Sequence, residues 1–199
     1  MLSRLLLTLT LVLAACNTRP GPEVLAPDDG ALPAGARIVQ VLTVTTRAPD
    51  AYGATRATSP NWLEYEVSVP PGHKPGRIEW PDGASDATKN FTVRKQTELS
   101  REGFAGRLPR SGVGLYIHGF NTRYQEALYR AVQLSVDAHL EGAPVLFTWP
   151  SAGNAGAYLA DRDASDFSRA ALADLLGLLT KNRRSSEPVP VLAHSMGAR

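Results

Sequence analysis

A serine close to the end of the chain stands in a pattern that suits nucleophilic chemistry. Ser195 lies in the stretch 193–197, which has the sequence Ala-His-Ser-Met-Gly, directly after the apolar run 189–193. A serine in the tight turn between a buried strand and a helix exposes its hydroxyl, and the residues two before and two after it must be small because neighbouring backbone comes very close. Ala193 and Gly197 meet this requirement. The pattern therefore predicts that Ser195 is a nucleophile.

A second motif supplies what such a nucleophile needs. His118, Gly119 and Phe120 follow directly after the apolar run 113–117. When a serine attacks a carbonyl group, two backbone N–H groups must stabilise the negative charge that develops on the carbonyl oxygen. We expect these donors to be the N–H groups of Phe120 and Met196, the latter following the serine. We expect His118 to be structural, because its neighbours and not its ring do this work.

The elements that must position these residues alternate between strands and helices. Short apolar runs at 113–117, 144–149 and 189–193 predict strands, and the two segments between them have apolar residues at helical spacing, the first opened by a capping box at 122–125. Strands alternating with helices predict a mostly parallel sheet with helices on both faces, which is an α/β fold. Earlier strands are predicted at 37–45, at 63–69 as an antiparallel or edge strand, and near 91–93.

Three motifs in this order resemble those of a known superfamily. Residues 117–122 read Ile-His-Gly-Phe-Asn-Thr, residues 147–151 read Phe-Thr-Trp-Pro-Ser, and residues 193–197 form the serine turn. Over residues 37–199 the chain resembles the α/β-hydrolase (esterase/lipase) superfamily, and more closely a bacterial family of uncharacterised function. The resemblance implies a serine hydrolase acting on small ester or related acyl substrates, with Ser195 as nucleophile.

The order of the candidate residues along the chain does not supply the catalytic acid and histidine. In this superfamily the catalytic acid and histidine follow the nucleophile, whereas only residues 196–199 follow Ser195 here. Asp161, Asp163 and Asp166 precede it, so they stand in the wrong order. We therefore expect residues 37–199 to be the N-terminal part of a hydrolase domain, incomplete at its C-terminus and inactive by itself. A non-catalytic envelope lipoprotein that uses the fold as a binding module is the alternative.

The N-terminus predicts export and lipid attachment. Residues 1–15 combine one positive charge, a short apolar stretch and small final residues, which is typical of a cleaved signal peptide. Residues 13–16 read Leu-Ala-Ala-Cys and resemble the bacterial lipobox, which implies acylation of Cys16. A plain secretory signal ending near a buried cysteine is the alternative. Asn17 favours the outer membrane, facing the periplasm. The proline-rich stretch from Cys16 to residue 36 is expected to be a flexible tether.

Composition excludes other classes of function. Lys plus Arg number 21 and Asp plus Glu number 19, and no basic run is present, so we expect no nucleic-acid partner. The chain has one cysteine and therefore no internal disulfide. His73 and His139 have no second ligand at metal spacing nearby in the sequence. We expect neither a metal site nor a cofactor, and the oligomeric state stays open.

Overall fold

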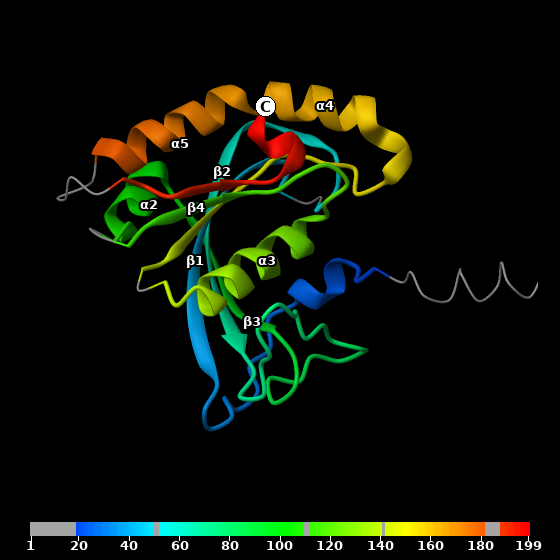
Figure 1. Cartoon of the computed structure of the whole chain (residues 1–199), viewed down its shortest axis with the longest axis vertical. Coiled ribbons are helices and arrows are strands. Elements are labelled where there is room, and N and C mark those ends of the chain that lie inside the picture. The colour runs from blue at the N-terminus through cyan, green and yellow to red at the C-terminus, as the bar shows by residue number, and fades with distance from the viewer. Residues whose placement is uncertain (1–18, 50–51, 110–111, 141, 182–187) are drawn as a thin grey trace, which may run out of the picture.

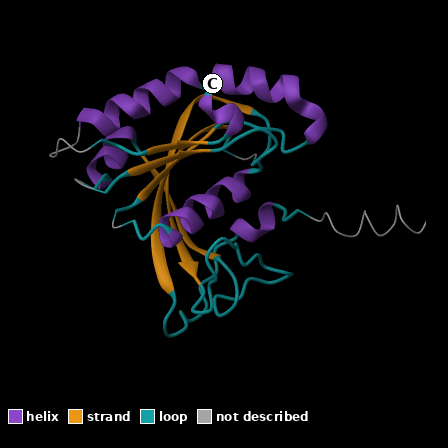
Figure 2. Cartoon of the chain, in the orientation of Figure 1, coloured by secondary structure: helices purple, strands orange, loops and turns teal. Residues whose placement is uncertain are grey.

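The computed structural model describes residues 19–49, 52–109, 112–140, 142–181 and 188–199, and a six-stranded sheet forms its centre (Figures 1 and 2). The predicted signal peptide and Cys16 lie outside the described residues. The strand order is β3-β2-β1-β5-β4-β6. The strands are β1 (Arg37–Arg47), β2 (Arg56–Val69), β3 (Thr92–Leu99), β4 (Gly114–Ile117), β5 (Pro144–Thr148) and β6 (Val191–Ala193).

The sheet is mostly parallel, as the sequence predicts. β1, β5, β4 and β6 pair in parallel, while β2 pairs antiparallel with both β1 and β3. In β1 and β5, at the centre of the sheet, side chains are buried on both faces. In β1, Val41 belongs to one core cluster and Leu42 to the other. Because both faces are covered there, these strands read as continuous apolar runs in the sequence, whereas the edge strand β6 leaves Val191 and Leu192 49% and 52% exposed.

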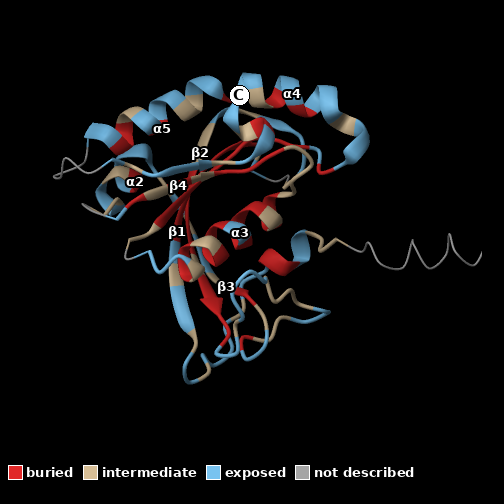
Figure 3. Ribbon diagram, in the orientation of Figure 1, coloured by how far each residue is buried: buried red, intermediate tan, exposed pale blue. Residues whose placement is uncertain are grey.

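Helices cover both faces of this sheet. α3 (Tyr124–Asp137) packs on one face, and α2 (Arg101–Arg107), α4 (Tyr158–Phe167) and α5 (Arg169–Lys181) contribute to the core on the other. Figure 1 shows α4 and α5 end to end along one side of the sheet, with the C-terminus beneath them. The buried residues in Figure 3 concentrate in the strands and on the inner side of α3. The predicted α/β fold is therefore confirmed.

The ends of two helices differ from the sequence-based expectation. α3 begins after Arg123 and not at Thr122, because the Glu126 carboxylate accepts the Arg123 N–H at 2.8 Å while the Thr122 hydroxyl donates to a carbonyl of the preceding turn. The single helix expected before β6 is two helices. They meet at Ser168, whose hydroxyl donates to the Ala164 carbonyl at 2.8 Å.

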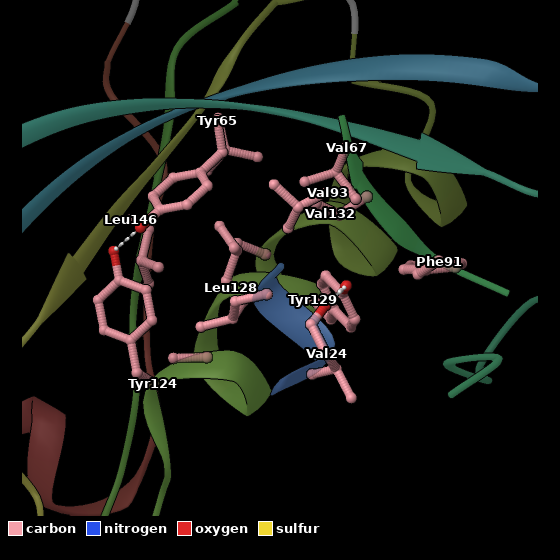
Figure 4. Packing of buried hydrophobic residues seen from close by; sticks show 14 of the residues in the cluster. Val24, Tyr65, Val67, Phe91, Val93, Tyr124, Leu128, Tyr129, Val132 and Leu146 are labelled. Atoms are coloured by element: carbon pink, nitrogen blue, oxygen red, sulfur yellow. Dashed lines mark hydrogen bonds between the residues drawn. The ribbon is translucent and has the colours of Figure 1, made fainter. Parts of the chain in front are cut away.

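The flexible tether expected over residues 16–36 is wrong for residues 19–36. This segment forms a short 3-10 helix, η1 (Pro22–Leu25), in which Val24 and Leu25 are 4% and 2% exposed. The Tyr129 hydroxyl donates to the Val24 carbonyl at 2.6 Å (Figure 4). These two apolar side chains belong to the same core cluster as residues of α3 and β3, which helps to hold the segment on the domain. The folded unit therefore begins at least at Arg19.

Within the described residues, the structure contains no helix both long and apolar enough to cross a membrane.

Candidate active site

Ser195 lies in a strained turn between β6 and the short 3-10 helix η3 (Ser195–Ala198). Its φ angle is +52°, a left-handed conformation that costs free energy for a residue with a side chain. Two hydrogen bonds fix the turn: the His194 N–H donates to the Ile117 carbonyl at 3.0 Å, and the Gly197 N–H donates to the His194 carbonyl at 2.9 Å. Ser195 is exposed. The structure thus presents the serine as the sequence predicts for a nucleophile turn.

Two glycines allow this turn to pack against β4. A Cβ added to Gly197 would collide with the His118 carbonyl oxygen and lie 3.0 Å from the Ile117 carbonyl oxygen. A Cβ added to Gly119 would lie 2.6 Å from His194 Nδ1 and 3.0 Å from Ser195 Cβ. Both spaces are too small for a methyl group. The requirement for a small residue two positions after the serine therefore has a direct steric cause at Gly197, and the close approach at Gly119 is an additional finding.

The loop after β4 leaves the predicted oxyanion donor free. The backbone N–H groups of residues 121–123 are each held by a side-chain oxygen, at 3.0, 3.1 and 2.8 Å, from Asp161, Ser151 and Glu126 in that order. The Phe120 N–H takes part in none of the hydrogen bonds found among the described residues. Because the preceding residue touches the serine turn, this free donor lies beside the candidate nucleophile. Its role in binding an oxyanion stays a prediction.

The second predicted donor, the Met196 N–H, follows the serine directly. The Met196 side chain is 5% exposed and packs in the same core cluster as Ile117 and Trp149. This burial anchors the residue after the nucleophile, so its backbone cannot rotate freely. Its role in oxyanion binding is also a prediction.

His118 is part of the scaffold of the site. It is fully buried and stacks on Trp149 with ring centroids 4.6 Å apart. Its Nδ1 lies 2.9 Å from the Gly119 carbonyl oxygen, and its Nε2 lies 3.1 Å from the Trp149 carbonyl oxygen and 3.0 Å from the Thr148 hydroxyl. Burial, followed by the charge of Arg47, lowers the pKa of His118 to about 3. Both ring nitrogens are engaged, so His118 fixes the loop and does not act as a base.

A buried carboxylate joins the loop after β4 to the loop after β5. Asp161 is fully buried, and its Oδ2 accepts the Asn121 N–H at 3.0 Å and the Ser151 hydroxyl at 2.6 Å. Its Oδ1 accepts the Ala152 N–H at 2.7 Å. The Ser151 oxygen in turn accepts the Thr122 N–H. Asp161 therefore positions both loops, and its oxygens are occupied by these donors.

Arg47 ties the same two loops from the side of β1. Its guanidinium donates to the Thr122 carbonyl at 3.2 Å and to the Ser151 carbonyl at 2.9 Å, and the residue is 1% exposed. Burial lowers the pKa of Arg47 to about 10, although the nearby Tyr124 and Asp161 oppose this shift. The guanidinium remains charged at neutral pH. It is a buried cation that satisfies carbonyl groups which would otherwise be unpaired.

Arg19 reaches the site from the N-terminal segment. Its guanidinium donates to Asn121 twice, to Oδ1 at 2.7 Å and to the carbonyl at 2.8 Å, and also to the Gly153 carbonyl at 3.0 Å. It forms an ion pair with Glu126. Asn121 has a φ of +56°, which asparagine tolerates better than most residues. Arg19 thus holds this strained residue of the oxyanion loop in place.

A groove of about 310 Å³ runs beside the serine turn on the face that carries α3. Its lining includes an aromatic side chain from β4 and the histidine next to the nucleophile; the lining residues are Ile78, Trp80, Tyr116, Thr122, Glu126, Arg130 and His194. Trp149, by contrast, is 1% exposed and belongs to the core. The groove thus reaches the serine turn at His194, and its lining includes neither Ser195 nor the two predicted oxyanion donors.

The described residues do not supply a catalytic base. No hydrogen bond found among them joins Ser195 Oγ to a histidine or a carboxylate. The same residues contain no group of three or more His, Cys, Asp or Glu side chains suited to a metal ion.

The roles of Arg19, Arg47 and Asp161 were not predicted. The apolar pair Val24–Leu25 is the sequence feature that could have indicated that the proline-rich segment packs on the domain.

Comparison with known proteins agrees with this geometry. No curated protein and no solved structure gives a significant match. The sequence model of the family described as "Alpha/beta hydrolase of unknown function (DUF900)" matches residues 79–199, a range that includes the loop after β4, the loop after β5 and the serine turn. The chain therefore belongs to this family of alpha/beta hydrolases.

Proposed function

We propose that the protein is a serine hydrolase of esters or related acyl substrates, with Ser195 as the nucleophile. The observation that carries the proposal is the left-handed conformation of Ser195 directly against Gly119, beside the free N–H of Phe120. A strained serine turn next to unpaired backbone donors is what attack on a carbonyl group requires.

The proposed reaction has two steps. Ser195 Oγ attacks the carbonyl carbon while a base removes its proton, and the Phe120 and Met196 N–H groups bind the resulting oxyanion. The alcohol leaves with that proton, and water then hydrolyses the acyl-enzyme to the free acid. Among the described residues no histidine or carboxylate is bonded to Ser195 Oγ, so we assign the nucleophile and the oxyanion donors and leave the base unassigned.

We also propose that lipid attached to Cys16 anchors the protein in the outer membrane, facing the periplasm. The support is the lipobox-like sequence at residues 13–16 and the asparagine that follows. In cells grown with a labelled fatty acid, the wild-type protein should incorporate label and Cys16→Ser should not. Equal labelling of the two would exclude the anchor.

Hydrolysis of a short p-nitrophenyl ester tests the catalytic proposal. Ser195→Ala should lower kcat/KM by several orders of magnitude, because the attacking oxygen is lost. Ser165→Ala is the control, since the hydroxyl of this half-buried residue donates to the Arg162 carbonyl in its own helix. It should leave kcat/KM unchanged. Wild-type protein without esterase activity would favour the binding-module alternative.

A further inference from the structure

The Arg19 contacts set the distance between the site and any lipid on Cys16. Arg19 is bound to Asn121 and Gly153, which lie in the two loops that frame the serine turn. Arg123 strengthens this attachment by donating to the carbonyls of Arg19 and Pro20 at 3.1 and 3.2 Å. The N-terminal segment is thus fixed at the edge of the candidate site, and not at the opposite end of the sheet.

The remaining connection to the predicted lipid is short. Arg19 is the third residue after Cys16, and a fully extended chain spans at most about 3.5 Å per residue. The point at which lipid would be attached, the Cys16 Cα, is therefore at most about 11 Å from the Arg19 Cα. A flexible tether of the length expected from the sequence would allow the site to face any direction. Because Arg19 is bound at the edge of the site, the short connection restricts the directions that the site can face.

An exposed apolar pair lies on the same rim. Tyr158 and Leu159 at the start of α4 are 52% and 64% exposed. The Tyr158 ring packs edge-to-face against Phe120, whose N–H is the predicted oxyanion donor, with centroids 5.3 Å apart. Aromatic and aliphatic side chains of this kind enter the boundary between headgroups and acyl chains of a bilayer. The rim of the site thus presents apolar surface beside the anchored end of the chain.

We propose that this rim, formed by Arg19, Phe120, Tyr158 and Leu159, rests on the membrane and that the substrates are acyl esters held in that membrane. The proposal deepens the proposed function and rests on it, because it assumes lipid on Cys16 and attack by Ser195. The short connection brings the rim to the lipid surface, and the apolar pair enters it.

Tryptophan quenching by brominated lipids tests the orientation. The mature lipoprotein is reconstituted in phosphatidylethanolamine and phosphatidylglycerol vesicles with or without brominated acyl chains. Emission from Leu159→Trp, corrected for wild-type emission, should fall by roughly half or more, since a side chain on an interfacial face sits about 5–10 Å into the boundary. The control Leu140→Trp, at an equally apolar position that is 41% exposed and lines a groove at the other end of the sheet, should not be quenched.

A second preparation keeps this test independent of lipidation in cells. Cys16 is the single cysteine, so the chain from Cys16 onwards can be coupled there to a maleimide phospholipid. Quenching of Leu159→Trp but not Leu140→Trp supports the proposal in either preparation. Vesicle-bound protein in which Leu159→Trp is not quenched, or in which both variants are quenched equally, overturns it. Failure of metabolic labelling would contradict the proposed anchor and the orientation that assumes it, while leaving Ser195 as nucleophile.

Substrate preference gives the second readout. A Gly/Ser linker of about 20 residues inserted before Arg19 lengthens the reach of the anchor to about 25 Å. In the active form, this insertion should lower hydrolysis of a vesicle-embedded ester at least tenfold and leave hydrolysis of soluble p-nitrophenyl acetate unchanged. Unchanged hydrolysis of both substrates would refute the membrane substrate while leaving Ser195 as nucleophile.

Discussion

Replacing Asp161 by asparagine removes one charge between the two loops that frame Ser195 and keeps the shape of the side chain. The carboxylate accepts three hydrogen bonds, from the Ala152 N–H at 2.7 Å, the Asn121 N–H at 3.0 Å and the Ser151 hydroxyl at 2.6 Å. An asparagine has one acceptor oxygen, so its NH₂ group must face either the Ala152 N–H or the Asn121 N–H.

The cost follows from these contacts. A buried N–H that loses its acceptor costs about 1–3 kcal/mol, and the surviving bonds lose their charge-assisted part. The change also removes a negative charge near buried Arg47. We expect Asp161→Asn to lower the free energy of unfolding by about 2–4 kcal/mol, which corresponds to a Tm lower by about 5–15 °C in a protein of this size.

Urea and thermal denaturation followed by circular dichroism measure this change. Asp163→Asn, two residues away, is the matched control: its side chain is 60% exposed and lies 3.5 Å from Arg162. This change should alter the free energy of unfolding by no more than about 0.5 kcal/mol. If Asp161→Asn were as stable as Asp163→Asn, the carboxylate would not hold the loops together and the description of the site would be wrong.

Three further predictions concern the scaffold. Gly197→Ala should destabilise the protein by about 1–3 kcal/mol because its methyl group meets the His118 carbonyl, whereas Gly177→Ala, with nothing within 4 Å in a helix, should be neutral or stabilise it by up to about 1 kcal/mol; urea titration compares them. His118 binds a proton below about pH 6.5 when unfolded but only near pH 3 when folded, so stability should fall as the pH drops through this range, by about 1 kcal/mol per pH unit, and His118→Asn should show a smaller slope in denaturation at several pH values. Leu25→Ala should cost about 2–4 kcal/mol and Leu32→Ala, 45% exposed, almost nothing; equal thermal stability of the two would mean that η1 is not docked.

The parallel half of the fold could be predicted because its signals are local. The runs before His118 and Ser195 are apolar, which is typical of strands in a parallel sheet, although the described residues leave the run before Ser195 exposed at the edge of the sheet. The antiparallel half of the sheet gives weaker signals in the sequence. β3 extends to Leu99 although only its first residues are apolar, because backbone pairing with β2 and not burial holds residues 94–98 in the strand. α2 was missed because it buries only Phe104.

The candidate nucleophile could also be predicted, whereas the residues that position its surroundings could not. The serine turn demands small residues at fixed spacing, which a sequence shows directly. Arg19, Arg47 and Asp161 act through contacts between segments far apart in the chain, and nothing in their local sequence marks them. Such contacts become visible only when the sheet brings β1, the two loops and the N-terminal segment to one edge.

The most direct test of the nucleophile is to locate a covalent adduct. A fluorophosphonate probe reacts with an activated serine, and mass spectrometry of the digested protein identifies the modified residue. The adduct should be on Ser195, and Ser195→Ala should not form it. An adduct on another serine, or ester hydrolysis that proceeds without any adduct on Ser195, would contradict the account.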